Sequence, residues 1–241
     1  MRPTSSHMVI GVVGFLSAAP FSGEGAAQSV VPVHEEPRHR LMYEDAHLQV
    51  LDIGFEPGDT TLFHRHDRPI AYVEIDATVV NQQVLGGAWG RVSPDAAPPV
   101  RPPGRVSRNE RYAEAPVDHR VTAVGPGNFR LIGVVHRGDG PGEARSGAFG
   151  PFDEVDAATR YFTYLRAEVG SGDAVRWPRV ERPVVMVMGS DGRVEVTLGA
   201  PEEAATRLTD AGAFLVLPRG SAGHIRNVGA TPVVLSFVEV R

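Results

Sequence analysis

One stretch of this chain occurs twice, and the second copy lacks the histidines of the first. The segment GDTTLFHRHDRP contains His64 and His66, and the segment GDAVRWPRVERP follows it 114 residues later. The offset relates seven identical positions, so the two segments are copies of one ancestral unit. The identical pairs are Leu51/Leu165, Gly58/Gly172, Asp59/Asp173, Arg65/Arg179, Arg68/Arg182, Pro69/Pro183 and Val73/Val187.

The repeat predicts a duplicated domain. A chain of 241 residues then divides into two domains of roughly 100 residues, each able to bury its own core. At the histidine positions the second copy has Pro178 and Val180, whose side chains cannot bind a metal. One repeat therefore carries a chemistry that the other lost or never had.

Charge and composition narrow the classes of function and fold. Charged residues make up 22% of the chain, the formal net charge is -5, and no basic run exceeds a scattered pair. A nucleic-acid partner is therefore not expected. The 27 glycines and 20 prolines separate short apolar runs, which is typical of strands joined by turns. We expect an all-β fold with two sandwiches or barrels, and only the segment PEEAATRL at 201–208 looks briefly helical.

The first 27 residues predict an export signal peptide. Arg2 precedes the apolar stretch MVIGVVGFLSAAPF, and small residues follow up to Ala27. Cleavage before Gln28 would give a periplasmic or secreted protein. The alternative is a membrane anchor, but glycine and proline interrupt a run shorter than the ~20 apolar residues of a spanning helix. We therefore expect no stable membrane insertion after processing.

The remaining chain is expected to comprise two domains joined by a glycine-rich linker. A lead segment from Val33 to Arg40 precedes the first strand, and we expect its histidines, His34 and His39, to be exposed. The expected boundaries are 28–140 for the N-terminal domain, 141–157 for the linker and 158–241 for the C-terminal domain.

The paired histidines of the first repeat are suited to metal binding. Residues i and i+2 of a strand face one side, about 6.5 to 7 Å apart at the backbone, so His64 and His66 can converge. Two imidazoles make a weak site, and His119 in the same repeat is the natural third ligand. Neutral imidazole is free to bind a metal at neutral pH. The alternative is that two histidines are exposed on a strand and the third is unrelated.

The arrangement resembles the first motif of the cupin superfamily, in which glycine, five residues and His-x-His are followed by a glutamate. Gly58, His64 and His66 have this spacing. The second cupin motif has a proline, a histidine and then an asparagine. The segment APVDHRVTAVG resembles it in part through His119, with Ala123 in place of the asparagine.

The second repeat also resembles that second motif, although His224 falls one place late. The resemblance covers both halves of the chain and implies two tandem cupin-type (jelly-roll) β-barrels, as in a two-domain cupin or bicupin. The matching residues of the second repeat are Gly212, Pro218, Gly220, His224 and Asn227.

The departures from the family pattern concern the carboxylate. The glutamate of the family would fall near Ile70 or Ala71, and neither can bind a metal. What remains resembles the three-histidine variant of the cupin site, found among some non-haem iron dioxygenases. Glu74 is the nearest carboxylate downstream, and we expect a strand-end charge exposed to water rather than a ligand. Asp67 should point to the opposite face of the strand, where it pairs with Arg68 or orients a histidine ring.

The expected cofactor is one divalent metal ion in the first repeat. Three neutral histidines leave its charge uncompensated, which favours an anionic substrate or hydroxide at the open positions. Fe, Mn, Zn, Ni and Cu are all candidates, because relative affinity alone does not select the biological metal. Tyr72, Gln82, Gln83 and Tyr112 lie in strand-like runs and are candidates to line a barrel mouth.

Three functions are compatible with these residues. The leading hypothesis is an exported, metal-dependent oxygenase that acts on a small organic molecule, with the metal on His64, His66 and His119. One alternative is a non-catalytic cupin that binds a small ligand, and another is an isomerase or lyase for a sugar or organic acid. Cupins support many reactions on one fold, so the sequence names no catalytic residue.

The second repeat is expected to be structural. Without a His-x-His pair, His224 cannot complete a site with three protein ligands, and we expect a loop histidine hydrogen-bonded to backbone. Duplicated barrels can pack face to face and bury apolar surface. The degenerate copy would then serve as a scaffold or as the surface of a homodimer.

Overall fold

The computed structural model describes residues 29–93, 95–97, 100–138, 140, 153–156, 159–199 and 204–241. These residues form strands and two short 3-10 helices but no α-helix, which confirms the all-β prediction. No helix in them has the length and hydropathy needed to span a membrane. The predicted signal peptide, 1–27, and most of the predicted linker lie outside the described residues.

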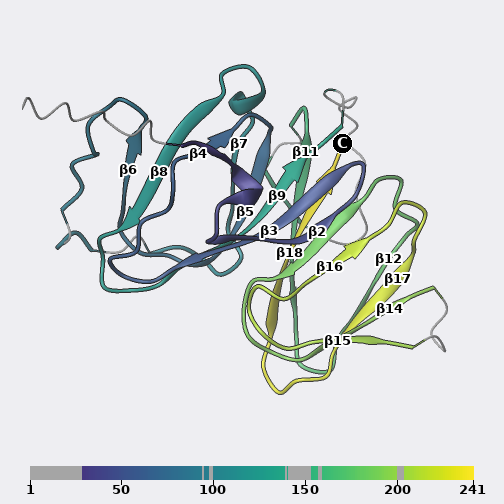
Figure 1. The fold of residues 1–241 in the computed structure, drawn as a ribbon. Coiled ribbons are helices and arrows are strands. Elements are labelled where there is room, and N and C mark those ends of the chain that lie inside the picture. The colour runs from purple at the N-terminus through teal and green to yellow at the C-terminus, as the bar shows by residue number, and fades with distance from the viewer. Residues whose placement is uncertain are drawn as a thin grey trace, which may run out of the picture.

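The first repeat forms two sheets (Figure 1). The smaller sheet has the strand order β1-β4-β8-β6, and the larger has the order β2-β3-β9-β5-β7. The helix η1 (Val33–Glu35) follows β1, and η2 (Arg111–Ala113) precedes β8. The strands are β1 (Val31–Pro32), β2 (His39–Glu44), β3 (Leu48–Phe55), β4 (His64–His66), β5 (Ile70–Asp76), β6 (Val80–Val84), β7 (Val106–Asn109), β8 (Val117–Ala123) and β9 (Phe129–His136).

The second repeat has the same plan. Its five-stranded sheet has the order β10-β11-β18-β13-β16, and its four-stranded sheet has the order β12-β17-β14-β15. The order β3-β9-β5 thus corresponds to β11-β18-β13, and β4-β8-β6 corresponds to β12-β17-β14. The strands are β10 (Asp153–Asp156), β11 (Phe162–Val169), β12 (Ala174–Trp177), β13 (Val184–Met188), β14 (Val194–Leu198), β15 (Thr206–Leu208), β16 (Phe214–Leu217), β17 (Gly223–Asn227) and β18 (Val233–Val240).

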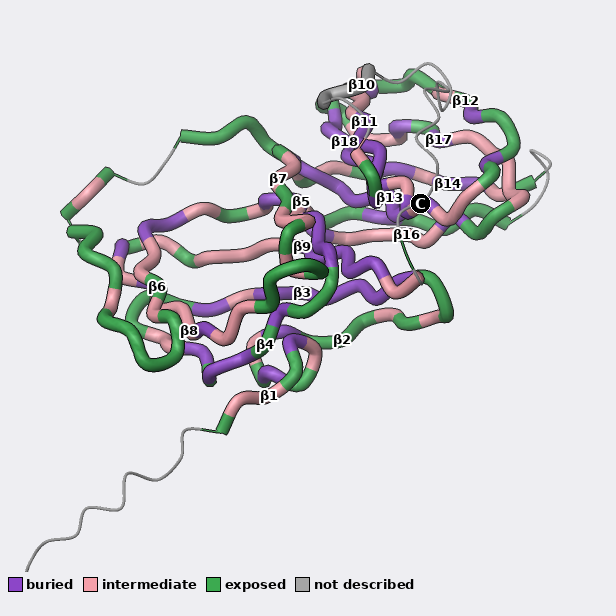
Figure 2. The backbone as a smooth tube through the Cα atoms, turned by 90° about the horizontal axis from the view of Figure 1, so that it is seen from above, coloured by how far each residue is buried: buried purple, intermediate pink, exposed green. Residues whose placement is uncertain are grey.

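The five-stranded sheets of the two repeats pack on each other. Side chains alternate along a strand, so β5 directs Ala71 and Val73 toward the second repeat, and β13 directs Val185 and Val187 toward the first. These four residues occupy equivalent positions of the repeat and belong to one buried cluster. Figure 2 shows buried stretches along β3, β5 and β9 of one repeat and β11, β13 and β18 of the other. The expected face-to-face packing of the repeats therefore occurs within one chain.

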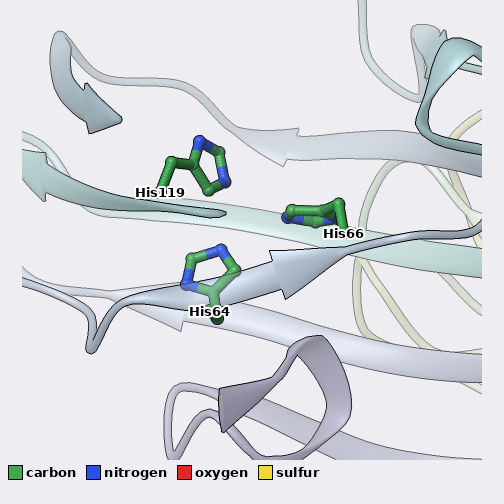
Figure 3. Close-up of side chains that lie close together, drawn as sticks. All are labelled: His64, His66 and His119. Carbon is green, nitrogen blue, oxygen red and sulfur yellow. The ribbon is translucent and has the colours of Figure 1, made fainter. Parts of the chain in front are cut away.

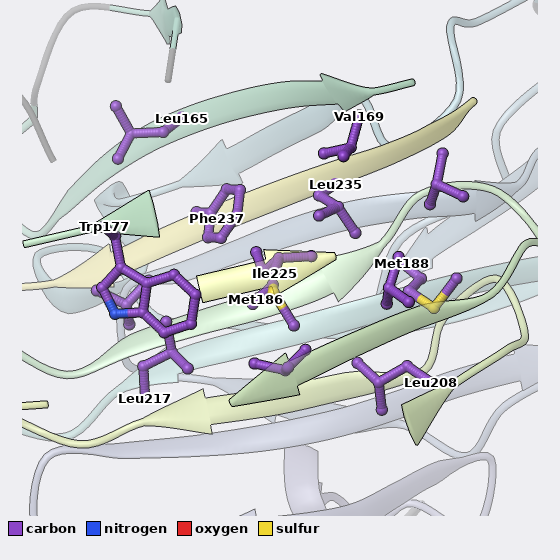
Figure 4. Close-up of a cluster of buried hydrophobic side chains, with 14 of the residues drawn as sticks. Leu165, Val169, Trp177, Met186, Met188, Leu208, Leu217, Ile225, Leu235 and Phe237 are labelled. Carbon is purple, nitrogen blue, oxygen red and sulfur yellow. The ribbon is translucent and has the colours of Figure 1, made fainter. Parts of the chain in front are cut away.

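The interior of the second barrel is filled by apolar side chains (Figure 4). Met186 and Met188 of β13 point into it beside Phe237 of β18, and all three are fully buried. Trp177 of β12 in the opposite sheet and Val180, which follows that strand, belong to the same cluster. Shape-filling apolar packing of this kind makes the second repeat a stable body without any bound group.

Two segments differ in secondary structure from the expectation. Thr206–Leu208, within the segment expected to be briefly helical, is strand β15 and pairs with β14. The prediction of a helical turn there was wrong, because tertiary pairing overrides the local propensity. Asp153–Asp156, within the expected linker 141–157, pairs with β11 as the edge strand of the second large sheet.

Candidate metal centre

Three histidines of the first repeat lie together between its two sheets. His64 and His66 project from the same face of β4, and β8 places His119 directly opposite His64. One nitrogen of each ring lies within 4.8 Å of the other two, and Figure 3 shows the three rings grouped around one point. Two nitrogens on one ion, each about 2.0 to 2.2 Å from it, are separated by at most about 4.4 Å. Small side-chain shifts would therefore bring all three onto one ion.

The backbone and an aromatic ring orient two of these histidines. His64 Nδ1 donates a hydrogen bond to the carbonyl oxygen of Leu62 at 3.0 Å, which leaves the lone pair on Nε2. His66 stacks on Tyr112 with ring centres 4.6 Å apart and an interplanar angle of 23°. A ring held in this way needs little reorganisation to bind a metal.

The third histidine has an unsatisfied nitrogen. His119 Nε2 is buried and has no hydrogen-bond partner among the described residues. A buried polar atom without a partner is costly, and a metal ion is the group that would satisfy it between two further imidazoles. The donor set of three imidazole nitrogens fits a divalent transition-metal ion.

Burial keeps the triad neutral. Desolvation, with a smaller contribution from the nearby His64, lowers the pKa of His119 from 6.5 to about 4. The pKa of His66 is well below its ordinary value, because of burial and then of the charges that His119 and His64 would carry. Burial also lowers the pKa of His64. At neutral pH all three rings therefore have the protonation state that metal binding requires.

The triad opens onto a cavity of about 260 Å³ between the sheets. Of the four residues named from the sequence as candidates to line a barrel mouth, Tyr72, Gln82 and Tyr112 line it. Gln83 does not, because it accepts a hydrogen bond from Arg120 Nε at 2.7 Å on the other face of β6. The remaining lining residues are His39, Ile53, Phe55, His64, His66, Glu74, Val80, Arg101, Ser107, His119, Val121, Phe129 and Leu131.

A fourth histidine lies beside the triad, and the prediction that it is exposed was wrong. His39 has only 4% of its surface exposed, and its ring lies edge-on to that of His64 with centres 4.6 Å apart. Its Nδ1 donates to the carbonyl oxygen of Val33 at 3.1 Å. The buried carboxylate of Glu36 accepts hydrogen bonds from the backbone N–H groups of Arg38 and Leu62, which ties this segment to the start of β4. The three nitrogens that lie within 4.8 Å of one another belong to His64, His66 and His119. His39 is therefore a neighbour of the triad and not a member.

The carboxylate downstream of the triad is buried, so the expectation of an exposed strand-end charge was also wrong. Glu74 is 5% exposed and lines the cavity from β5. Its Oε1 accepts hydrogen bonds from Nη1 of Arg101 and from Nη1 of Arg105, the latter at 2.7 Å. The two arginines make burial of the carboxylate possible. Asp67, in contrast, is exposed and lines an outer groove away from the cavity.

Comparison with known proteins identifies the fold. No protein-family model matches the chain, and no curated protein sequence matches it. Among solved structures, salicylate 1,2-dioxygenase from Pseudoaminobacter salicylatoxidans matches with a TM-score of 0.55 at 11% identity, over 82% of this chain and 69% of that one. Oxalate decarboxylase from Lactobacillus farciminis matches with a TM-score of 0.52 at 13% identity, over 81% of this chain and 77% of that one. AerE from Microcystis aeruginosa matches with a TM-score of 0.52 at 10% identity, over 86% and 98%.

The chain has the two-domain cupin fold. Only the first cupin barrel brings such a histidine triad together within the described residues. In the second barrel, Gly223 takes the place of His119. Val84 of the first barrel pairs with His119, and Leu198, which is equivalent to Val84 in the second barrel, pairs with Gly223. A Cβ atom at Gly223 would lie 2.7 Å from the ring of Trp177, so the indole occupies the space of the missing imidazole.

The motif-like residues of the second cupin barrel are structural. His224 lies in strand β17 rather than in the expected loop, and its neighbour Ile225 is the one that points into the apolar core. The amide of Asn227 donates to the carbonyl oxygens of Val169 at 2.9 Å and Thr231 at 2.8 Å. Asn227 thus holds a turn together and does not face a ligand site.

Proposed function

We propose that this protein is a metal-dependent cupin enzyme, an oxygenase that acts on a small organic molecule. One divalent metal ion would be held by His64, His66 and His119. The observation that carries the proposal is the convergence of three buried, neutral imidazoles within 4.8 Å, one of which has a nitrogen with no protein partner. Leaving such an atom unsatisfied costs about 1 to 3 kcal/mol, which a metal bond would remove.

The residues around the triad define what could happen there. Three protein ligands leave further coordination positions on the side of the cavity. A bound metal ion supplies positive charge that binds and polarises an oxygen-containing ligand. The apolar wall formed by Ile53, Phe55, Phe129 and Leu131 excludes water from a molecule held beside the triad. The chain itself holds the ligand rings in place through the backbone of Leu62 and the ring of Tyr112.

One polar group favours an enzyme over a binding protein. A purely ligand-holding pocket needs no acid or base, whereas the carboxylate of Glu74 lines this cavity. The structural match to a salicylate 1,2-dioxygenase supports oxygenase chemistry as the leading candidate. The match to an oxalate decarboxylase supports a second candidate, a lyase that acts on an organic acid.

Metal content and oxygen uptake test the proposal. The purified protein should contain one divalent metal ion per chain by elemental analysis, and His64→Ala should lose most of it. His224→Ala is the matched control, because it removes a histidine from the second barrel and should leave the stoichiometry unchanged. Protein reloaded with Fe(II) should consume oxygen in the presence of a small hydroxylated aromatic acid. Equal metal content in the wild type and His64→Ala would contradict the metal site, and release of carbon dioxide without oxygen uptake would favour the lyase.

We also propose that the protein is exported, since the order of charge, apolar run and small residues at 1–27 matches a signal peptide. Amino-terminal sequencing of the protein recovered from the periplasm or medium should begin near Gln28. Recovery of intact Met1 from that fraction would contradict export by cleavage.

A further inference from the structure

We propose that the cavity takes a small carboxylic acid, that Arg101 binds its carboxylate, and that the second barrel holds Arg101 in position. The proposal rests on the proposed function, because it takes the triad and its cavity as the ligand site. It assigns a substrate class to that site and a role to the repeat that lost its own ligands.

The charges around the cavity favour an acidic ligand. Glu74 and Arg101 both line the cavity and offset each other, while Arg105 donates to Glu74 from outside the cavity and adds one positive charge beside it. Imidazole binds a metal as a neutral ligand, so three of them would not offset the charge of a divalent ion. The cavity with its metal ion would therefore be net positive, and a neutral or cationic ligand would leave this charge uncompensated.

Arg101 is the residue placed to recognise the acid. It lines the cavity, whereas Arg105 does not, and its side chain is 38% exposed. A guanidinium carries five N–H donors, and Glu74 is the only hydrogen-bond partner of Arg101 in the described part of the chain. Donors therefore remain for a ligand carboxylate, which guanidinium groups bind with two parallel hydrogen bonds. Glu74 engages Nη1 of Arg101, so the Nε and Nη2 donors remain for the ligand.

The cavity also selects the body of the ligand. Phe55 and Phe129 stack on each other with ring centres 4.6 Å apart, and both line the cavity together with Ile53 and Leu131. A volume of about 260 Å³ accommodates a small molecule with an apolar or aromatic body. Such a ligand would place its carboxylate at Arg101 and its body against this apolar wall.

The second barrel anchors the loop that carries both arginines. Gly104, between Arg101 and Arg105, is buried, and its carbonyl oxygen accepts a hydrogen bond from Ser236 Oγ of β18 at 2.6 Å. Gly104 has a φ of +65°, and a Cβ there would lie 2.5 Å from Ser236 Oγ and 3.1 Å from the Cα of Gly189. Only glycine permits this conformation and this approach. The loop is therefore pinned to the second barrel between the two arginines that donate to Glu74.

Calorimetric titration with two probes tests the assignment of Arg101. The probes are 2-hydroxybenzoate and its uncharged amide, 2-hydroxybenzamide, titrated into the full-length protein with and without cobalt(II). The wild type should bind the acid at least about tenfold more tightly than the amide. Arg101→Gln should bind both with similar affinity, and Arg101→Lys should recover part of the preference. Arg105 still pairs with Glu74 in these variants, so the buried carboxylate keeps a partner.

Two control variants separate this effect from general changes. Arg91→Gln removes one exposed positive charge of the first barrel outside the cavity and should keep the wild-type preference. Ser236→Ala should weaken the preference for the acid severalfold without changing cobalt stoichiometry. Ser171→Ala, which removes another hydroxyl of the second barrel, should not change it, because Ser171 donates to Gly229 instead.

The outcomes are distinct. A wild type with no preference for the acid, or an Arg101→Gln variant that keeps it, overturns the assignment of Arg101. A Ser236→Ala variant that binds both probes like the wild type overturns the anchoring role of the second barrel. Absence of cobalt binding overturns the proposed metal function, while the preference measured on metal-free protein still decides the role of Arg101.

Discussion

Acidification from about pH 7 to about pH 5 should destabilise the metal-free protein through its buried histidines. Burial lowers the pKa of His39 from 6.5 to about 3, and that of His119 to about 4. In the unfolded chain both rings take up a proton as the pH falls through about 6.5. The folded protein takes up the same protons only at about pH 3 to 4. Stability is therefore fully present above about pH 6.5 and is lost between that pH and the folded pKa values.

The size of the effect follows from the two pKa values. Between about pH 7 and pH 5 each of these histidines becomes nearly fully protonated in the unfolded chain and stays neutral in the folded one. Each then removes roughly 2 kcal/mol of stability, so His39 and His119 together remove roughly 4 kcal/mol. The lowered pKa values of His64 and His66 act in the same direction. This loss is a large part of the ~5 to 15 kcal/mol that typically stabilises a folded domain.

Urea unfolding of metal-free protein at several pH values measures this loss. His39→Gln keeps an amide donor for the carbonyl oxygen of Val33 but cannot titrate, so its stability should fall by roughly 2 kcal/mol less than that of the wild type. His34→Gln is the matched control, because His34 lies in the same segment with 36% of its side chain exposed. NMR titration of the histidine rings gives the pKa values directly. A wild type that loses less than about 1 kcal/mol, or rings of His39 and His119 that titrate near pH 6.5, would refute the reasoning.

Three further changes test the packing at the site, in the second barrel and in the core that the two repeats share. Tyr112→Leu removes the ring stacked on a ligand histidine and should weaken cobalt affinity by about tenfold in chelator competition, with Tyr112→Phe close to wild type. Gly223→Ala should destabilise the protein by about 1 to 3 kcal/mol in urea unfolding, because its Cβ would lie 2.2 Å from the carbonyl oxygen of Thr197 and 2.7 Å from the ring of Trp177. Phe162→Ala in the core shared by the two sheets should cost about 3 to 5 kcal/mol in urea unfolding. Val100→Ala, at a fully exposed position, should change the stability by less than about 0.5 kcal/mol, and equal effects of the two would contradict the shared core.

The sequence predicts those features of the fold and the site that depend on a fixed spacing between residues. The 114-residue offset places β5 and β13 at equivalent positions, and alternation along each strand then decides which side chains face the shared core. The spacing of His64 and His66 places both on one face of β4. The position of His119 followed from the second motif, and strand pairing places it directly opposite His64.

The features missed by sequence reasoning depend on contacts between distant segments. His39 is buried because Glu36 binds the backbone of Leu62, 26 residues away, and no local pattern reveals that contact. Glu74 is buried because Arg101 and Arg105 reach it from a proline-rich loop 27 and 31 residues away. Carboxylates are usually exposed unless they are paired. The fold supplies two arginine partners for Glu74, and the local sequence does not show them.

The equivalent inward-facing positions explain how one duplicated barrel came to have a cavity and the other a filled core. Glu74 of the first barrel corresponds to Met188 of the second, and the neighbouring Tyr72 corresponds to Met186. Polar side chains are costly inside a barrel unless a ligand, metal or charge partner satisfies them, whereas methionine fills irregular space without such a need. A barrel that lost its histidine pair would therefore gain stability from each apolar replacement. The filled barrel then offers a rigid surface, and Ser236 of that barrel holds the loop whose Arg101 lines the cavity of its neighbour.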